Sequence, residues 1–251
     1  SSSCAPAMIV LNAAVADTLR TFKTETDALI AGGIKKDEAI FKVLKRYIVE
    51  SSRIRFEGDG YSESWEKEAM KRGLRNIKSV PESLGSYLDK KSKKVLIDGG
   101  IFTARELEAR VGVEYEKYTK KVQIEARVLG DLAINHIVPT AIRYMTELLD
   151  NIKSLRMVFS EIEYERLSGA RKEVVTGISD NISMIKRLVR EMIEERKKAN
   201  IIEDAGEKAF AYEKNVKPYL EKIRYHIDRL ELIVDNEIWP LPKYRELLFT
   251  R

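Results

Sequence analysis

Cysteine, histidine, glycine and proline are all scarce in this chain of 251 residues. The one cysteine, Cys4, excludes a disulfide framework and favours a reducing compartment. Thirteen glycines and six prolines provide little material for turns, which favours long helices over strands. The two histidines, His136 and His226, are too few for a zinc site unless carboxylates complete the ligand set. These absences indicate a helical protein held together by an apolar core.

Long hydrophobic runs are also missing. No apolar segment reaches the length of a membrane span, and Ser1–Ser3 lack the charged region that opens a signal peptide. The net charge is +5, but acidic and basic residues are mixed along every predicted helix, and no basic block is interleaved with aromatic residues. We therefore expect a cytoplasmic protein that binds neither nucleic acid nor a membrane.

The longest helical pattern runs from Thr103 to Phe159. Thr103 and Glu106 have the spacing of a capping box, in which each side chain accepts a hydrogen bond from the other residue's amide. Apolar residues then recur at helical spacing at Leu107, Val111, Tyr115, Tyr118, Val122, Leu129, Leu132, Ala141, Met145, Leu148, Ile152 and Leu155. Pro139 lies inside this pattern, so we expect a kink or a short break there.

Two further helices are predicted after Phe159, with a turn between them near Ala199 to Asp204. The first has an apolar seam at Val174, Ile178, Ile182, Ile185, Val189 and Met192. The second has one at Ala209, Tyr212, Val216, Tyr219, Ile223, His226, Leu230 and Ile233. Such seams predict an antiparallel bundle with left-handed crossings of about 20°. The apolar, proline-containing tail from Trp239 to Arg251 should dock on its own domain or on a neighbouring subunit.

Shorter helices are predicted in the first half. The first begins near Pro6, is apolar on most sides in its first half, and ends at Gly32–Gly33, so we expect it to be buried by partners from a missing upstream segment. Another follows Asp37, and Ser79 and Glu82 form a second capping box. The Gly58–Gly60 segment matches neither a phosphate loop nor a calcium loop, and we interpret it as a turn before a Ser-capped helix that runs to about Lys71.

No catalytic constellation is recognisable in the sequence. His226 lies on an apolar seam, where a core histidine with a satisfied hydrogen bond is favoured over a ligand. His136 lies beside Pro139, where a local structural bond is expected. We assign no catalytic, cofactor-binding or metal-binding residue to this chain. Taken alone, the residues indicate an all-α structural or interaction protein.

Several motifs resemble one known family. Residues 1–19, with Pro6 opening an Ala-rich helix, resemble the Asn-Pro-Tyr-Leu helix near the end of the glutamine synthetase catalytic domain, although Ala5 and Ala7 replace the Asn and the Tyr. Gly99 to Leu107 is similar to that domain's closing Gly-Gly-Val-Phe-Thr segment and final helix. The chain most closely resembles the large type III enzymes, which are found mainly in bacteria. This resemblance is carried by residues 53–58, 60–62, 127–133, 135–144 and 239–251.

This resemblance implies a ligase that makes glutamine from glutamate, ammonia and ATP through γ-glutamyl phosphate, using divalent Mg or Mn. In that family the metal-binding glutamates, the ATP-binding residues and an Arg-x-Glu-x-Arg strand all lie upstream of the helix that begins at Pro6 here. No catalytic residue is therefore carried over, and the isolated chain is expected to be inactive. Its expected partners are the upstream catalytic half of the same polypeptide and further copies in a homo-oligomer.

The expected architecture is a long antiparallel helical bundle preceded by shorter helices that close a truncated catalytic domain. Residues 1–125 are predicted to be the end of that domain, and residues 126–251 a helical extension with a docking tail. The extension is expected to support the catalytic domain and subunit contacts. The alternative is a stand-alone helical adaptor or oligomerisation module without catalysis.

Overall fold

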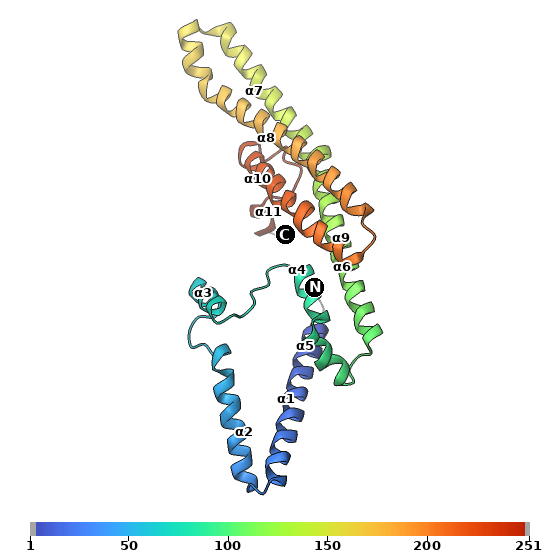
Figure 1. Ribbon diagram of the computed structural model, residues 1–251. Helices are drawn as coiled ribbons and strands as arrows, with labels where there is room; N and C mark the ends of the chain where they lie inside the picture. Colours follow the sequence, from blue (N-terminus) through green and yellow to red (C-terminus); the bar gives the residue numbers. More distant parts are fainter. Residues whose placement is uncertain (1–3, 249–251) are drawn as a thin grey trace. The chain divides into compact units, whose positions relative to one another are not determined.

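The computed structural model of the protein describes residues 4–248, which form helices and contain no strand (Figure 1). This confirms the all-α prediction. The chain divides into two compact units, residues 1–114 and 115–251, here called unit 1 and unit 2. The boundary expected at residue 125 refers to the extent of a catalytic domain and stays a prediction.

Unit 1 consists of short helices and one long helical hairpin. Its elements are α1 (Ala5–Ala31), α2 (Lys36–Glu50), a 3-10 turn (Ser51–Ile54), α3 (Glu63–Lys71), α4 (Val80–Gly85), a 3-10 turn (Ser86–Leu88), α5 (Lys90–Lys93), a π-helical turn (Lys94–Asp98) and the start of α6 (Ala104–Asp131). The capping box at Thr103 is formed, because the Thr103 amide donates to Glu106 at 2.8 Å and the Glu106 amide donates to Thr103 Oγ1 at 3.2 Å.

The hairpin of α1 and α2 turns at Gly32–Gly33, as predicted, and Gly33 has a φ of +89° that favours glycine. The Phe22 and Tyr47 rings meet edge to face at 5.8 Å between centroids. The Glu25 carboxylate accepts hydrogen bonds from Tyr47 Oη at 2.9 Å and from Arg46. These contacts tie the second half of α1 to α2.

Within this chain α1 is largely exposed, and its burial by an upstream segment stays a prediction. Only Ala13 and Thr26 of this helix are buried, whereas Leu11 is 66% exposed. In its first half α1 packs, within unit 1, on the turn at Lys94–Asp98, where Ala13 meets Leu96 in a small cluster. One narrow contact covers one side of a helix, so the apolar residues on the other side remain at the surface.

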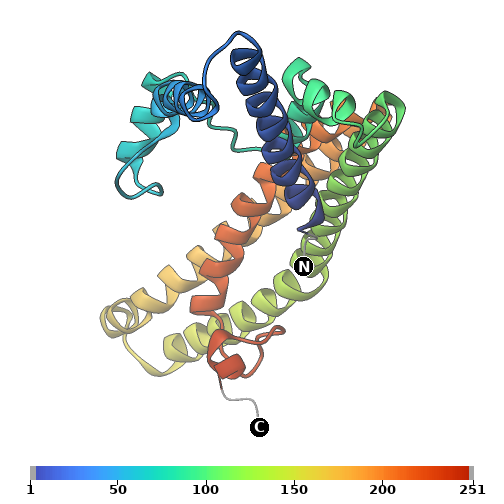
Figure 2. The same cartoon turned by 90° about the horizontal axis from the view of Figure 1, so that it is seen from below.

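Unit 2 contains the remainder of α6 and a helical bundle. Its further elements are a π-helical turn (Leu132–Ile137), α7 (Val138–Val158), α8 (Glu161–Ile201), α9 (Ala205–Ala211), a second π-helical turn (Tyr212–Val216), α10 (Lys217–Ile233) and α11 (Tyr244–Leu248). Helices α7, α8 and α10 lie side by side with alternating directions (Figures 1 and 2), which confirms the antiparallel arrangement. The turn predicted between the two seams is present, since α8 ends at Ile201 and α9 begins at Ala205.

The predicted seams form the core of unit 2. Fully buried positions of these seams include Ile178, Ile185, Ala209, Tyr212, Val216, Ile223 and Leu230. They pack with Ala133, Ile137 and Ala141 from the end of the central helical segment. Gly130 faces the α8 side chains, and a Cβ there would make ordinary van der Waals contact at 3.6 Å with Met192 Cε and Val189 Cγ1.

The irregularity expected at Pro139 is a π-helical turn just before the proline, and the chain stays helical through it. A wider turn accommodates the proline, which has no amide hydrogen and whose ring crowds the carbonyl four residues back. A second π-helical turn precedes Pro218 and interrupts the helix that the sequence analysis treated as continuous. The same steric reason applies there.

The tail docks on its own unit at its beginning. Trp239 is 8% exposed and belongs to the core, and Leu241 packs against that core. Lys243 Nζ lies 5.6 Å from the Trp239 ring centroid and donates to the Glu231 carbonyl at 2.7 Å. Leu247 is exposed, so docking is confirmed for the first part of the tail, and residues 249–251 lie outside the described residues.

Candidate interaction surface

The apolar side of α1 that remains exposed is the first candidate functional surface. Four residues spaced by three, four and four positions form it: Met8, Leu11, Val15 and Leu19, which are 55%, 66%, 59% and 63% exposed. We call these four residues the α1 stripe. Its spacing places them along one side of the helix. Scattered exposed leucines are ordinary on protein surfaces, but a continuous apolar stripe marks a site that binds another protein segment.

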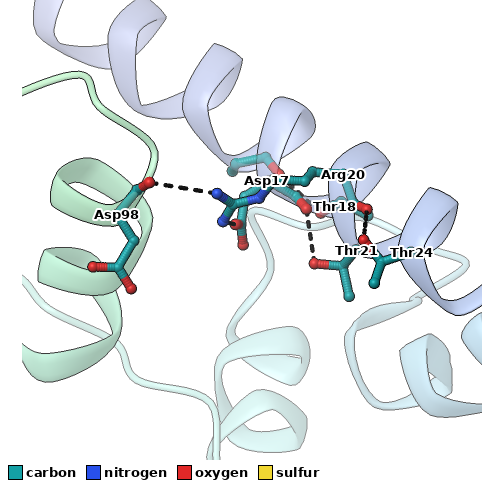
Figure 3. Close-up of polar contacts among 7 residues, drawn as sticks. Asp17, Thr18, Arg20, Thr21, Thr24 and Asp98 are labelled. Carbon is teal, nitrogen blue, oxygen red and sulfur yellow. Dashed lines mark hydrogen bonds and ion pairs between the residues drawn. The ribbon is translucent and has the colours of Figure 1, made fainter.

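A polar group on α1 includes one contact with the turn at Lys94–Asp98 (Figure 3). Arg20 Nη2 lies 2.5 Å from Asp17 Oδ1, and Arg20 Nη1 donates to the Asp98 carbonyl at 3.4 Å. Thr18, Thr21 and Thr24 each donate to the carbonyl four residues earlier, at 2.8, 2.9 and 3.0 Å. These threonine bonds stay within the helix, so the contact of this group with another element is the one between Arg20 and Asp98.

The Arg53–Gly58 motif also has a structural role. Arg53 Nη2 donates to the Gly73 carbonyl at 3.0 Å, and Arg72 Nη1 donates to the Arg55 carbonyl at 2.8 Å. The Phe56 and Trp65 rings stack at 4.3 Å between centroids. These reciprocal contacts close the loop between α2 and α3 onto the end of α3. The guanidinium groups are thus engaged with backbone carbonyls.

The loop that contains Gly58 and Gly60 is a turn, as predicted. Ser62 follows it as the cap of α3, since its hydroxyl oxygen accepts from the Trp65 amide at 3.3 Å. Ser79 caps α4 in the same way by accepting from the Glu82 amide at 3.4 Å, and that helix ends at Gly85. Helix α2 begins at Lys36, one residue before the Asp37 at which the sequence placed its start.

His226 is half-buried and hydrogen-bonded, so the bond predicted for its ring is present, whereas the ring lies at the edge of the core. Its Nδ1 lies 2.8 Å from Asn181 Oδ1, and Asn181 Nδ2 donates to the Gly177 carbonyl at 2.7 Å. Burial of the ring, and then the nearby Arg229 and Arg187 guanidinium groups, lower the pKa of His226 below its usual value. The imidazole borders an open hollow that Met184, Leu188, Glu221, Lys222 and Tyr225 also line.

His136 is exposed, and the local bond expected for its ring is absent within residues 4–248. Across the same residues, no group of three or more His, Cys, Asp or Glu side chains is arranged to hold a metal ion. Cys4 is exposed. In the described part of the chain, every helix is too short or too polar to cross a membrane.

The sequence analysis recognised the apolar residues of the α1 stripe and expected an upstream segment to bury them. Hydrophobicity gives the side of a helix that avoids water, and only the placement of neighbouring helices decides whether this chain covers that side. The mismatch between the apolar pattern and the exposed fractions identifies the surface.

Comparison with known proteins shows what this chain is similar to. Residues 39–156 match the family described as glutamine synthetase C-terminal domain. A glutamine synthetase from Bacteroides fragilis is 59% identical over the whole chain, which covers 34% of that relative. A type-3 glutamine synthetase from Dictyostelium discoideum is 32% identical over 97% of the chain and 33% of the relative. The chain therefore spans about a third of the length of the curated relatives it matches.

Proposed function

This chain belongs to the glutamine synthetase family and corresponds to a carboxy-terminal part of it, and we propose that the protein containing it makes glutamine from glutamate, ammonia and ATP. The reaction would pass through γ-glutamyl phosphate, with divalent Mg or Mn balancing the phosphoryl charge. This proposal is supported by the Bacteroides fragilis relative, whose alignment covers the whole chain with a sequence identity of 59%. The assignment to the type III class is supported by the type-3 relative.

The chemistry is assigned to the portion of the relatives that this chain does not cover. The described residues do not fit a metal-nucleotide site, because their carboxylates and histidines do not converge. The guanidinium groups of Arg20, Arg53 and Arg72 are engaged with backbone carbonyls. We therefore derive no catalytic step from this chain, and the isolated chain should be inactive.

The chain's own role is to support the catalytic portion of the same polypeptide. The observation that carries this role is the α1 stripe, which unit 1 leaves exposed. Covering each of these half-exposed side chains would contribute about 1 kcal/mol or more. The relatives are about three times as long as this chain, so a catalytic portion large enough to cover the stripe is available in the same polypeptide. The bundle in unit 2 would brace a homo-oligomer.

The remaining properties follow from the same proposal. The single cysteine favours the reducing cytoplasm as the location of the enzyme. Neither nucleic acid nor a membrane is proposed as a partner, because the charges of both signs are interspersed, as the ion pairs along the helices illustrate. The partners are the upstream catalytic portion and further copies of the same protein.

The test is to express this chain together with the upstream portion as separate polypeptides. Gel filtration and γ-glutamyl hydroxamate formation should show a large, active assembly that neither part gives alone. Leu11→Asp in the α1 stripe should abolish both association and activity. Leu232→Asp is the matched control, because Leu232 is 88% exposed on α10 of unit 2, and it should leave both unchanged.

Two results would contradict the proposal in different ways. Hydroxamate formation by the isolated chain would show that catalytic residues lie here after all. A folded chain that ignores the upstream portion, with Leu11→Asp behaving like Leu232→Asp, would favour the stand-alone helical adaptor.

A further inference from the structure

A polar cluster joins α6 to α8 in unit 2. Gln123 Nε2 on α6 donates to Asn200 Oδ1 on α8 at 3.3 Å, and the hydroxyl of the fully buried Tyr212 donates to the same oxygen at 2.6 Å. Further along α6, Gly130 faces Met192, which precedes Asn200 on α8. Residue numbers therefore rise along α6 while they fall along α8, so the two helices are antiparallel and the cluster fixes their register.

Two arginines lie next to this cluster, one on each helix. Arg127 follows Gln123 by one turn on α6. Arg196 precedes Asn200 by one turn on α8. Because the helices are antiparallel, these two turns lie at the same level, and residues four apart share one side of a helix. Burial raises the pKa of Tyr212 above its usual value, and the Arg196 and Arg127 guanidinium groups act in the opposite direction, so both lie near its hydroxyl.

The two guanidinium groups have no anionic partner among residues 4–248. Arg196 has no acidic residue three or four positions away on α8. Arg127 has one, Asp131, whose carboxylate accepts a hydrogen bond from Asn135 Nδ2 at 2.5 Å instead. The charged groups that act on the Tyr212 hydroxyl are likewise these two cations and no carboxylate. Like charges placed together repel each other, so an anion that bridges them would relieve this repulsion.

We propose that Arg127 and Arg196 together bind a phosphate group. At neutral pH a phosphate carries about two negative charges, which match the two guanidinium charges, whereas a carboxylate would balance only one. Each guanidinium group can donate two parallel hydrogen bonds to phosphate oxygens. The inference goes beyond the proposed function, because it holds whether or not the chain is part of an enzyme.

The surroundings of the two arginines favour a small ligand. Arg127 is exposed and Arg196 is half-buried, so a phosphate held between them would have one side on the protein and one side open to solvent. Both a free phosphate ion and the phosphate group of a larger ester fit such a site. The register of α6 against α8 is already fixed by Asn200, so the two arginines need little rearrangement on binding.

Phosphorus NMR of inorganic phosphate, recorded at neutral pH as the full chain is added, tests the site. The wild-type chain should shift or broaden the phosphate resonance. Arg127→Gln and Arg196→Gln should each weaken binding about tenfold or more, because each removes charge-assisted hydrogen bonds. Arg166→Gln is the matched control, since Arg166 is an exposed arginine of α8 about 45 Å along the helix from Arg196, and it should bind phosphate like the wild type. Circular dichroism confirms that each variant is folded.

Two further titrants identify the chemistry and the source of the anion. Glycerol phosphate that binds as tightly as inorganic phosphate would indicate a phosphate ester as the ligand, and weaker binding would indicate the free ion. Either result supports the site. Acetate at the same ionic strength should bind much more weakly, because it balances one charge only. Acetate that binds as tightly as phosphate would overturn the proposal.

Urea unfolding followed by Trp239 fluorescence gives an independent readout. Phosphate should raise the unfolding midpoint of the wild type and of Arg166→Gln more than that of Arg127→Gln, because a ligand stabilises the state that binds it. Without phosphate, Arg127→Gln should leave the midpoint unchanged or slightly raised, since the repulsion is removed. An unchanged phosphate resonance with the wild type, equal effects of Arg127→Gln and Arg166→Gln, or a lower midpoint of Arg127→Gln without phosphate would overturn the proposal.

Discussion

Units 1 and 2 differ in how completely their helices cover one another. Among the described residues, the core cluster of unit 2 contains twenty buried residues, whereas that of unit 1 contains only Ala13, Leu96 and Leu107. Unit 1 nevertheless carries abundant apolar residues, such as Leu11 and Phe41, at its surface. The difference shows that apolar content alone does not give a closed core, because a core also needs helices that face one another from several sides.

Polar contacts hold much of unit 1 together. Glu25 joins α1 to α2, Arg53 and Arg72 close the loop before α3, and Arg20 reaches Asp98. Exposed contacts of this kind each contribute about 1 kcal/mol or less. Unit 2 instead buries whole side chains, each worth roughly 1.5–3 kcal/mol. Unit 1 by itself should therefore unfold more readily, and covering the α1 stripe would strengthen it.

The largest expected effect comes from removing core volume from unit 2. Ile223→Ala should lower the free energy of unfolding by about 2–5 kcal/mol, since Ile223 is fully buried. Leu11→Ala in unit 1 should change it by less than about 0.5 kcal/mol. Urea unfolding followed by tryptophan fluorescence separates the units, because Trp65 lies in unit 1 and Trp239 in unit 2. Replacing either tryptophan by Phe isolates the other signal.

If Leu11→Ala lowered the free energy of unfolding as much as Ile223→Ala does, the α1 stripe would already be covered in the chain alone. The contrast between the two units would then be wrong, and so would the proposal that the stripe awaits the catalytic portion.

A smaller effect is expected at the Asn181–His226 pair, which joins α8 to α10 in unit 2. Asn181→Ala leaves His226 Nδ1 without its partner and should cost about 1–3 kcal/mol in the unfolding of unit 2. Because the folded pKa of His226 is lowered, the unfolded state takes up the proton first as pH falls. Stability contributed by the neutral ring is thus complete above the unfolded pKa of about 6.5 and declines as pH falls below it.

Urea unfolding followed by Trp239 fluorescence, repeated between neutral and mildly acidic pH, measures how steeply the stability of unit 2 changes with pH. His226→Gln keeps a side chain that can bond Asn181 but cannot titrate there, so its stability should vary less with pH. Identical slopes for the wild type and His226→Gln would show that the buried imidazole does not titrate in the way described.

Sequence reasoning succeeded wherever a feature depends on neighbouring residues in the chain. The capping box at Thr103, the hydroxyl cap at Ser79, the glycine ends of α1 and α3, and the two apolar seams are local patterns, and the structure contains each of them. Pro139 was recognised, but whether the helix would break or form a π-helical turn depended on packing around it. Pro218 carried the same signal and was overlooked.

The candidate surface was not predictable in the same way. The periodicity of Met8, Leu11, Val15 and Leu19 gives an apolar side, but exposure depends on which helices the rest of the chain places beside it. Burial is a tertiary property, and the sequence defines only the residues that would benefit from it.

The smallest expected effect concerns matched helix caps in the two units. Thr103 caps α6 in unit 1 and Ser160 caps α8 in unit 2, each in a capping box with the Glu three residues later. Thr103→Ala and Ser160→Ala should each cost about 1 kcal/mol, because each leaves a first-turn amide without its partner. Thr103→Ala should shift the Trp65 transition, and Ser160→Ala the Trp239 transition. Loss of a cap should remove a larger fraction of the free energy of unfolding in unit 1 than in unit 2, because fewer buried side chains oppose unfolding in unit 1. If both variants shift both signals together, the two units unfold as one, and the difference in core size does not divide the chain's stability.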